Sequence, residues 1–124
     1  SKGEANTIPA SADSIWWHNL GLALLKLEKY GEAEEACRRA IDMNPQSDTA
    51  WHNLGLALQN LEKHGKAEDA YRRAIDIDPQ NARAWSNLGS ALGNQDKYAE
   101  AEEALRRAID IDPQDAFAWY NFET

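Results

Sequence analysis

A tryptophan recurs at a fixed interval of 34 residues along this chain, and this interval constrains the fold more than any other feature. The four positions are Trp17, Trp51, Trp85 and Trp119. The first three each open a string of the form Trp-His/Ser-Asn-Leu-Gly, and the fourth reads Trp-Tyr-Asn-Phe. Repetition at one period indicates a single supersecondary unit that stacks on copies of itself and buries a continuous core. Such a stack presents a long surface, which favours binding over catalysis.

Each unit contains two stretches of helical periodicity. In the second unit, apolar or small residues follow helical spacing from Trp51 to Leu61 and again from Ala67 to Ile75. A proline closes each unit, since proline cannot continue a helix, and a good N-cap residue follows before the next unit. The prolines are Pro45, Pro79 and Pro113, and the expected caps are Asp13, Ser47, Asn81 and Asp115. This pattern predicts helices over residues 14–28, 31–43, 48–62, 65–77, 82–96, 99–111 and 116–123.

Small residues predict a close approach of the two helices in each unit. The glycines at positions 21, 55 and 89 are expected to face the alanines at positions 40, 74 and 108, although glycine costs about 1 kcal/mol in helix propensity. The single cysteine, Cys37, takes the place of Tyr71 and Leu105 and is interpreted as a core residue.

These recurring residues resemble the tetratricopeptide repeat family, whose pattern places tryptophan, leucine-glycine, alanines, an aromatic residue and proline at set spacings. The second repeat matches it with Trp51, Leu54, Gly55, Leu58, Ala67, Tyr71, Ala74 and Pro79. The tyrosine expected near the end of the first helix is leucine in every copy, which keeps the apolar volume. The resemblance implies an all-α superhelix, or solenoid, with helix-turn-helix repeats at residues 14–47, 48–81 and 82–115 and a partial fourth at 116–124. Residues 1–13 lack helical periodicity and are interpreted as a flexible arm or a cloning remnant.

Composition narrows the classes of partner. A net charge of -8 argues against nucleic acid and against anionic membranes, because both need clustered lysine and arginine. The sequence contains no signal-peptide pattern and no apolar run long enough to span a membrane, so we expect a cytoplasmic protein. It also contains no phosphate-binding loop, dinucleotide fingerprint or zinc-protease motif, and we expect no catalytic residues, metal or cofactor.

In this family the first helices line a concave groove, and their residues are therefore the candidate site. The candidates are Asn19, Asn53, Asn87 and Asn121, His18 and His52, Leu22 and Leu56, and Arg83, Ser86, Ser90 and Tyr120. The asparagines form a ladder with one member in each repeat, and an amide pairs with both the N–H and the C=O of a peptide backbone. Similar ladders hold peptides in the repeats of protein O-linked N-acetylglucosamine transferases. The alternative is that these asparagines belong to the general family pattern and contact only water.

Two other kinds of site are less favoured by the sequence. A two-carboxylate clamp for a chaperone C-terminus matches at Asn53 and Arg83 but not at His18, Leu22 or Asn87. On the second helices, acidic residues precede arginine pairs by four positions, at residues 34–39, 68–73 and 102–107. These arginines could form a phosphate or acidic-partner site, but a solvated face with internal ion pairs is favoured.

The resulting hypothesis is a non-enzymatic interaction module that binds an extended peptide or a helix of a partner protein in the groove. The alternatives are a substrate-selecting segment of a larger enzyme and a self-assembling spacer. Trp16 stands where later repeats have Ala50 and Ala84, so we also expect weak head-to-tail association through the ends of the repeat stack.

Overall fold

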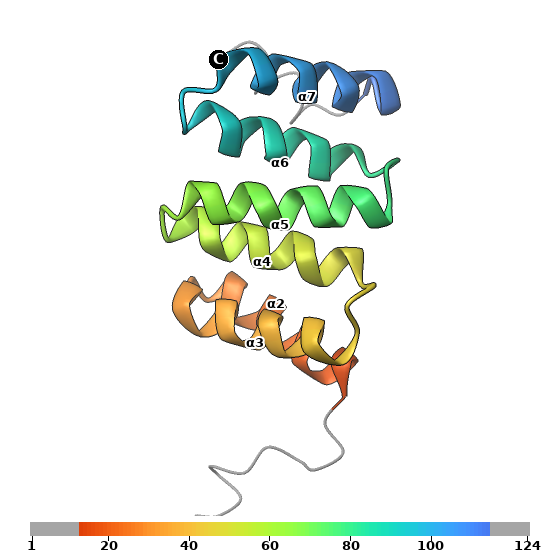
Figure 1. Ribbon diagram of the computed structural model, residues 1–124. Coiled ribbons are helices and arrows are strands. Elements are labelled where there is room, and N and C mark those ends of the chain that lie inside the picture. Colours follow the sequence, from red (N-terminus) through yellow and green to blue (C-terminus); the bar gives the residue numbers. More distant parts are fainter. Residues whose placement is uncertain (1–12, 115–124) are drawn as a thin grey trace, which may run out of the picture.

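The computed structural model describes residues 13–114, which form six α-helices joined by short turns (Figure 1). The helices are α2 (Ser14–Lys26), α3 (Tyr30–Met43), α4 (Asp48–Asn60), α5 (His64–Ile77), α6 (Ala82–Gly93) and α7 (Tyr98–Ile111). No strand occurs in these residues, and the predicted all-α class is confirmed. The helix predicted over residues 116–123, with Tyr120 and Asn121, lies outside the described part of the chain.

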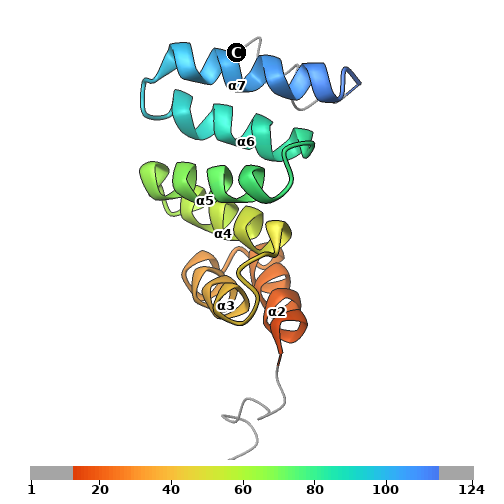
Figure 2. The same cartoon turned by 45° about the vertical axis from the view of Figure 1, so that its right-hand side comes forward.

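The helices form three hairpins that stack in one direction along the chain (Figures 1 and 2). Helix α2 pairs with α3, α4 with α5, and α6 with α7. Between repeats, α3 packs against α4 and α5 packs against α6, while α2 also touches α4. Each repeat therefore contacts only its neighbours, which is the arrangement of a solenoid.

A polar side chain caps the N-terminus of the first helix in each described repeat, as the sequence predicts. Asp13, Ser47 and Asn81 accept hydrogen bonds from the backbone N–H groups three residues later, at 3.0, 3.2 and 3.1 Å. Each bond satisfies one of the N–H groups that a helix start leaves without a partner.

The same first helices end two or three residues earlier than the sequence predicts. Glu28, Glu62 and Asp96 have φ angles of 61°, 62° and 63°, in the left-handed region. After α2, the N–H of Lys29 donates to the carbonyl of Leu24 at 2.8 Å, which reverses the chain as in a Schellman motif. Glycine is the usual signal for this geometry, and an acidic residue gives no such signal, so the sequence extends these helices too far.

The helices of one repeat meet at a glycine, but the residues opposite are not the expected alanines. A Cβ atom added to Gly55 would overlap Cε1 of Tyr71, whose ring is fully buried. The corresponding contacts join Gly21 to Cys37 and Gly89 to Leu105. The absent Cβ therefore makes room for the buried side chain at this position of the second helix, which is Cys37, Tyr71 or Leu105. Cys37 is buried as predicted, and burial raises the pKa of its thiol to about 12.

We expect Gly55→Ala to lower the free energy of unfolding by about 1–3 kcal/mol, because the new methyl group displaces the Tyr71 ring from a packed core. Gly31→Ala is the matched control, since a Cβ there meets nothing within 4 Å. It should be neutral or stabilise by up to about 1 kcal/mol through helix propensity. Urea unfolding followed by circular dichroism measures both, and equal effects of the two substitutions would contradict this account of the contact.

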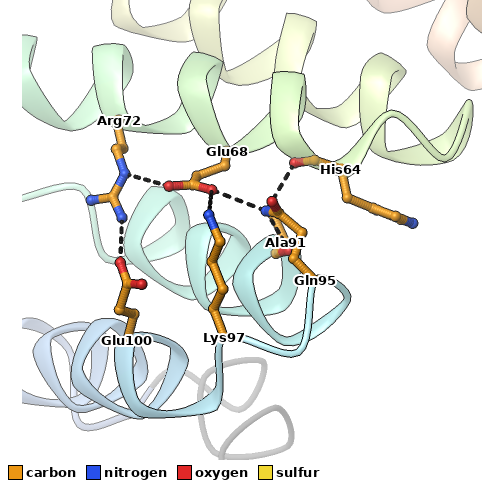
Figure 3. Close-up of polar contacts among 7 residues, drawn as sticks. All are labelled: His64, Glu68, Arg72, Ala91, Gln95, Lys97 and Glu100. Carbon is orange, nitrogen blue, oxygen red and sulfur yellow. Dashed lines mark hydrogen bonds and ion pairs between the residues drawn. The ribbon is translucent and has the colours of Figure 1, made fainter.

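A polar cluster joins neighbouring repeats on the second-helix side. Figure 3 shows Glu68 of α5 accepting from Arg72 at 2.9 Å and from Lys97 of the next repeat at 3.3 Å. Gln95 donates to the same carboxylate at 3.0 Å, and Arg72 reaches Glu100 at 3.3 Å. Partial burial on its own raises the pKa of Glu68, but these donors together hold it below its ordinary value.

The preceding interface repeats part of this cluster. Glu34 accepts from Arg38 at 3.0 Å and from Lys63 at 3.3 Å. The sequence predicted only exposed pairs within one helix. Those pairs are present, and the structure shows in addition that Glu34 and Glu68 are largely covered and link successive repeats.

The second arginine of each pair covers the repeated tryptophan. Arg73 lies 5.0 Å from the ring centre of Trp51, and the Trp51 indole N–H donates to the carbonyl of Pro45 at 2.9 Å. Trp85 makes the same two contacts, with Arg107 and Pro79. The tryptophan thereby ties both helices of its repeat to the preceding turn, and the arginine pairs are engaged within the fold.

Candidate functional site

The first helices α2, α4 and α6 carry the described candidate residues on a surface that we call the first-helix face. Helix α2 contributes His18, Asn19 and Leu22, α4 contributes His52, Asn53 and Leu56, and α6 contributes Arg83, Ser86, Asn87 and Ser90. Contact between α2 and α4 and a hydrogen bond between α4 and α6 hold these helices side by side.

The asparagines of the ladder differ in their solvent exposure. Asn19 is exposed and Asn53 is half-buried, whereas Asn87 is only 4% exposed. The Asn87 amide donates to Nε2 of His52 at 2.7 Å. Ser86 beside it is also buried. The sequence placed both residues on an open strip, but helical spacing alone does not show that α4 and its His52 cover this part of α6. Asn121 lies outside the described residues.

The hydrogen bond with Asn87 determines the tautomer of the His52 imidazole. An amide nitrogen is a donor only, so His52 Nε2 accepts and the imidazole is neutral with its proton on Nδ1. Burial lowers the pKa of His52, and the nearby charge of Arg83 lowers it further, while Asp48 acts in the opposite direction. The ring also meets Tyr71 edge-on, with 5.9 Å between ring centres.

A second polar chain crosses the same region, through a residue that the sequence analysis did not single out. The Tyr71 hydroxyl donates to Gln59 Oε1 at 2.7 Å, and the Gln59 amide donates to Ser90 Oγ at 2.9 Å. Gln59 stands where the other repeats have Leu25 and Gly93, and this polar replacement in an apolar column is the signal that could have identified it. Repeats two and three are thus joined by part-buried hydrogen bonds between side chains.

The open part of the first-helix face lies on repeats one and two. In the described structure, the side-chain amides of Asn19 and Asn53 have no hydrogen-bond partner. Leu22 is exposed and Leu56 is half-buried beside them. A hollow of about 140 Å³ opens next to His18, and its walls are Ser14, Ile15, His18, Ala40, Asn44, Ser47 and Thr49. This region offers amide donors and acceptors, apolar contacts and one small recess.

Within residues 13–114, no group of three or more histidine, cysteine, aspartate or glutamate side chains is placed to hold a metal ion. In the same residues, every helix is too short or too polar to cross a membrane.

We expect stability to fall as the pH drops below the ordinary histidine pKa of 6.5, because the folded state resists protonation of His52. The lowered pKa means that this contribution is present above 6.5 and is lost as the pH falls through it. Asn87→Asp should raise the pKa of His52, since a carboxylate favours the imidazolium. Proton NMR of the His52 ring and urea unfolding between about pH 5 and pH 8 measure both effects.

The control variants for this prediction are two histidine substitutions. His52→Gln should remove the acid-dependent loss in this window, and His64→Gln should leave it in place. A His52 resonance that titrates above 6.5 in the unaltered chain would contradict the burial of a neutral imidazole.

The comparisons with known proteins agree with this architecture. The family model for the tetratricopeptide repeat matches residues 18–82 and 52–116, which together cover most of the sequence. The chain therefore belongs to the tetratricopeptide repeat family. No curated protein gives a significant match.

Three solved structures illustrate the likeness. The first TPR domain of Spaghetti (RPAP3), bound to the HSP90 peptide SRMEEVD, has a TM-score of 0.87 at 22% identity, over 90% of this chain and 88% of that one. YrrB, described as a TPR protein with an unusual peptide-binding site, has a TM-score of 0.87 at 26% identity, over 93% and 59%. The TPR domain of Arabidopsis OM64 has a TM-score of 0.86 at 26% identity, over 89% and 91%.

Proposed function

We propose that this chain is a non-catalytic protein-interaction module that binds an extended peptide on the first-helix face of repeats one and two. The observation that supports this most is the pair of unpartnered amides on Asn19 and Asn53 beside apolar Leu22 and Leu56. Membership of a family whose structural neighbours include peptide-bound domains supports the same class of function.

The spacing of the two amides suits an extended backbone. Packed helices lie about 8–10 Å apart, and an extended chain advances about 3.3 Å per residue, so contacts to Asn19 and Asn53 are about three peptide residues apart. Amide pairing to a backbone does not depend on sequence. Selectivity then comes from Leu22 and Leu56, which favour apolar side chains, and from the recess beside His18, which accepts a small one.

Charge favours a neutral peptide over an acidic chaperone tail. The chain carries a net charge of -8, which disfavours approach of SRMEEVD, the acidic peptide bound by the RPAP3 domain. The positions that would complete a carboxylate clamp hold His18, Leu22 and Asn87, and Asn87 is already bonded to His52. We therefore assign the ligand to neutral, partly apolar segments in extended conformation.

Peptides selected on the immobilised chain from a random heptapeptide phage library provide the test. Calorimetry with the most enriched synthetic peptide should show that Asn19→Ala and Asn53→Ala each weaken binding roughly two- to tenfold, as expected for one lost hydrogen bond. Because both amides are unpartnered in the described structure, thermal stability should stay unchanged or rise slightly.

Gln80→Ala combined with Gln114→Ala is the matched control. It also removes two exposed amides, but from turns outside the first-helix face. The control should bind like the unaltered chain, and SRMEEVD should bind more weakly than the selected peptide. Equal affinities of the selected peptide for the two asparagine variants and for the control would contradict the proposed role of these amides.

A further inference from the structure

The hydrogen bonds that join Tyr71, Gln59 and Ser90 have a fixed direction. Within residues 13–114, the buried Tyr71 hydroxyl makes a single hydrogen bond, to Gln59 Oε1 at 2.7 Å. Burial raises the pKa of Tyr71, so the hydroxyl keeps its proton and needs an acceptor. If the Gln59 amide were turned round, this buried proton would face an N–H group and lose its acceptor, which is unfavourable.

This direction determines which proton Ser90 can offer. Because the Gln59 oxygen is taken by Tyr71, the amide presents Nε2 to Ser90 and donates to Oγ at 2.9 Å. A hydroxyl that accepts such a bond still has its own proton to donate. Ser90 Oγ makes no other hydrogen bond in the described part of the chain, and its side chain is half-buried, not enclosed. Ser90 therefore retains one O–H donor.

Ser90 changes the chemistry of the first-helix face at the third repeat. It occupies the position that Leu22 and Leu56 occupy in the two preceding repeats. The asparagine of the ladder does not take over a ligand contact there, because Asn87 is buried and bonded to His52. The face thus offers free amides and leucines on repeats one and two, and a hydroxyl donor on repeat three.

We propose that the Ser90 hydroxyl donates a hydrogen bond to a carbonyl oxygen of the bound peptide, and that Gln59 keeps Ser90 in this donor state. The inference rests on the proposed function and extends that site from two repeats to three. An extended heptapeptide spans about 20 Å, which matches two steps of about 8–10 Å between packed helices. The ligand class is an extended segment with apolar side chains on repeats one and two and an acceptor on repeat three.

Gln59→Glu reverses the bond to Ser90 without removing it. A carboxylate only accepts, so one oxygen takes the Tyr71 proton and the other takes the Ser90 proton, which leaves none for the peptide. Gln59→Leu combined with Tyr71→Phe removes both bonds and leaves the Ser90 proton available, and repeat one already has Leu25 at this position. A merely structural role of Gln59 makes the leucine variant the weaker binder, whereas the proposal makes the glutamate variant weaker.

The probe is the most enriched heptapeptide from the phage selection, and calorimetry at about pH 8, where glutamate is ionised, gives the affinities. Ser90→Ala and Gln59→Glu should each weaken binding roughly two- to tenfold, and the two together should weaken it no further. The leucine–phenylalanine variant should bind like the unaltered chain. So should Gln80→Glu, which makes the same chemical change in an exposed turn outside the first-helix face.

Two further measurements refine the test. Peptides with alanine at one position at a time identify the acceptor, because the effect of Ser90→Ala persists in all of them for a main-chain carbonyl and disappears in one for a side-chain carbonyl. Without any peptide, NMR should show one Gln59 Nε2 proton exchanging with water more slowly than those of Gln80. Equal exchange overturns the bond direction, even if Gln59→Glu fails to fold by circular dichroism.

The outcome also separates this inference from the proposed function. If Ser90→Ala binds the peptide like the unaltered chain, or the glutamate variant binds more tightly than the leucine–phenylalanine variant, the role of Ser90 is overturned. If Asn19→Ala and Asn53→Ala still weaken binding in that case, the proposed function stands and only its extension to repeat three is lost. A chain that binds no selected peptide in solution overturns both.

Discussion

The approach of the two helices in each repeat is limited by a glycine on the first helix that faces a larger buried side chain on the second. At Gly55 this partner is the Tyr71 ring, and any Cβ atom would overlap it. The close approach brings Trp51 under Arg73 and directs the Tyr71 hydroxyl to Gln59. This contact determines the shape of the first-helix face, because the position of α4 relative to α5 decides which side chains of α4 point outward.

Most of the fold was predictable because its sequence signals are short-range. The 34-residue period, the N-caps and the prolines are all signals within one repeat, and they placed the six described helices. The missed helix ends have a different cause, because a left-handed Glu62 or Asp96 resembles any exposed acidic residue in sequence. The partner of the glycines was missed because helical spacing gives the face of a residue but not its level along the opposing helix.

The candidate site was less predictable because it depends on contacts between repeats. Asn53 and Asn87 occupy equivalent positions in sequence, yet only Asn87 is buried and bonded. The difference arises from His52 on the preceding helix and from the way α4 and α6 pack. The role of Gln59 likewise depends on the fold, because only the fold brings Tyr71 and Ser90 within hydrogen-bonding distance of it. The 34-residue period predicts the features that the repeats share, whereas the candidate site depends on positions at which the repeats differ.

The uneven polar linkage between repeats has a consequence for how the stack opens. Repeats two and three share the Glu68 cluster and the part-buried hydrogen bonds of Gln59 and His52, whereas repeats one and two share the simpler Glu34 contact. Leu20 and Leu24 are also only partly buried, while their equivalents in later repeats are fully buried. In a one-dimensional array, local unfolding follows the weakest junction. The first hairpin is therefore the part of the described stack that we expect to open first, and it carries the more open part of the proposed peptide-binding surface.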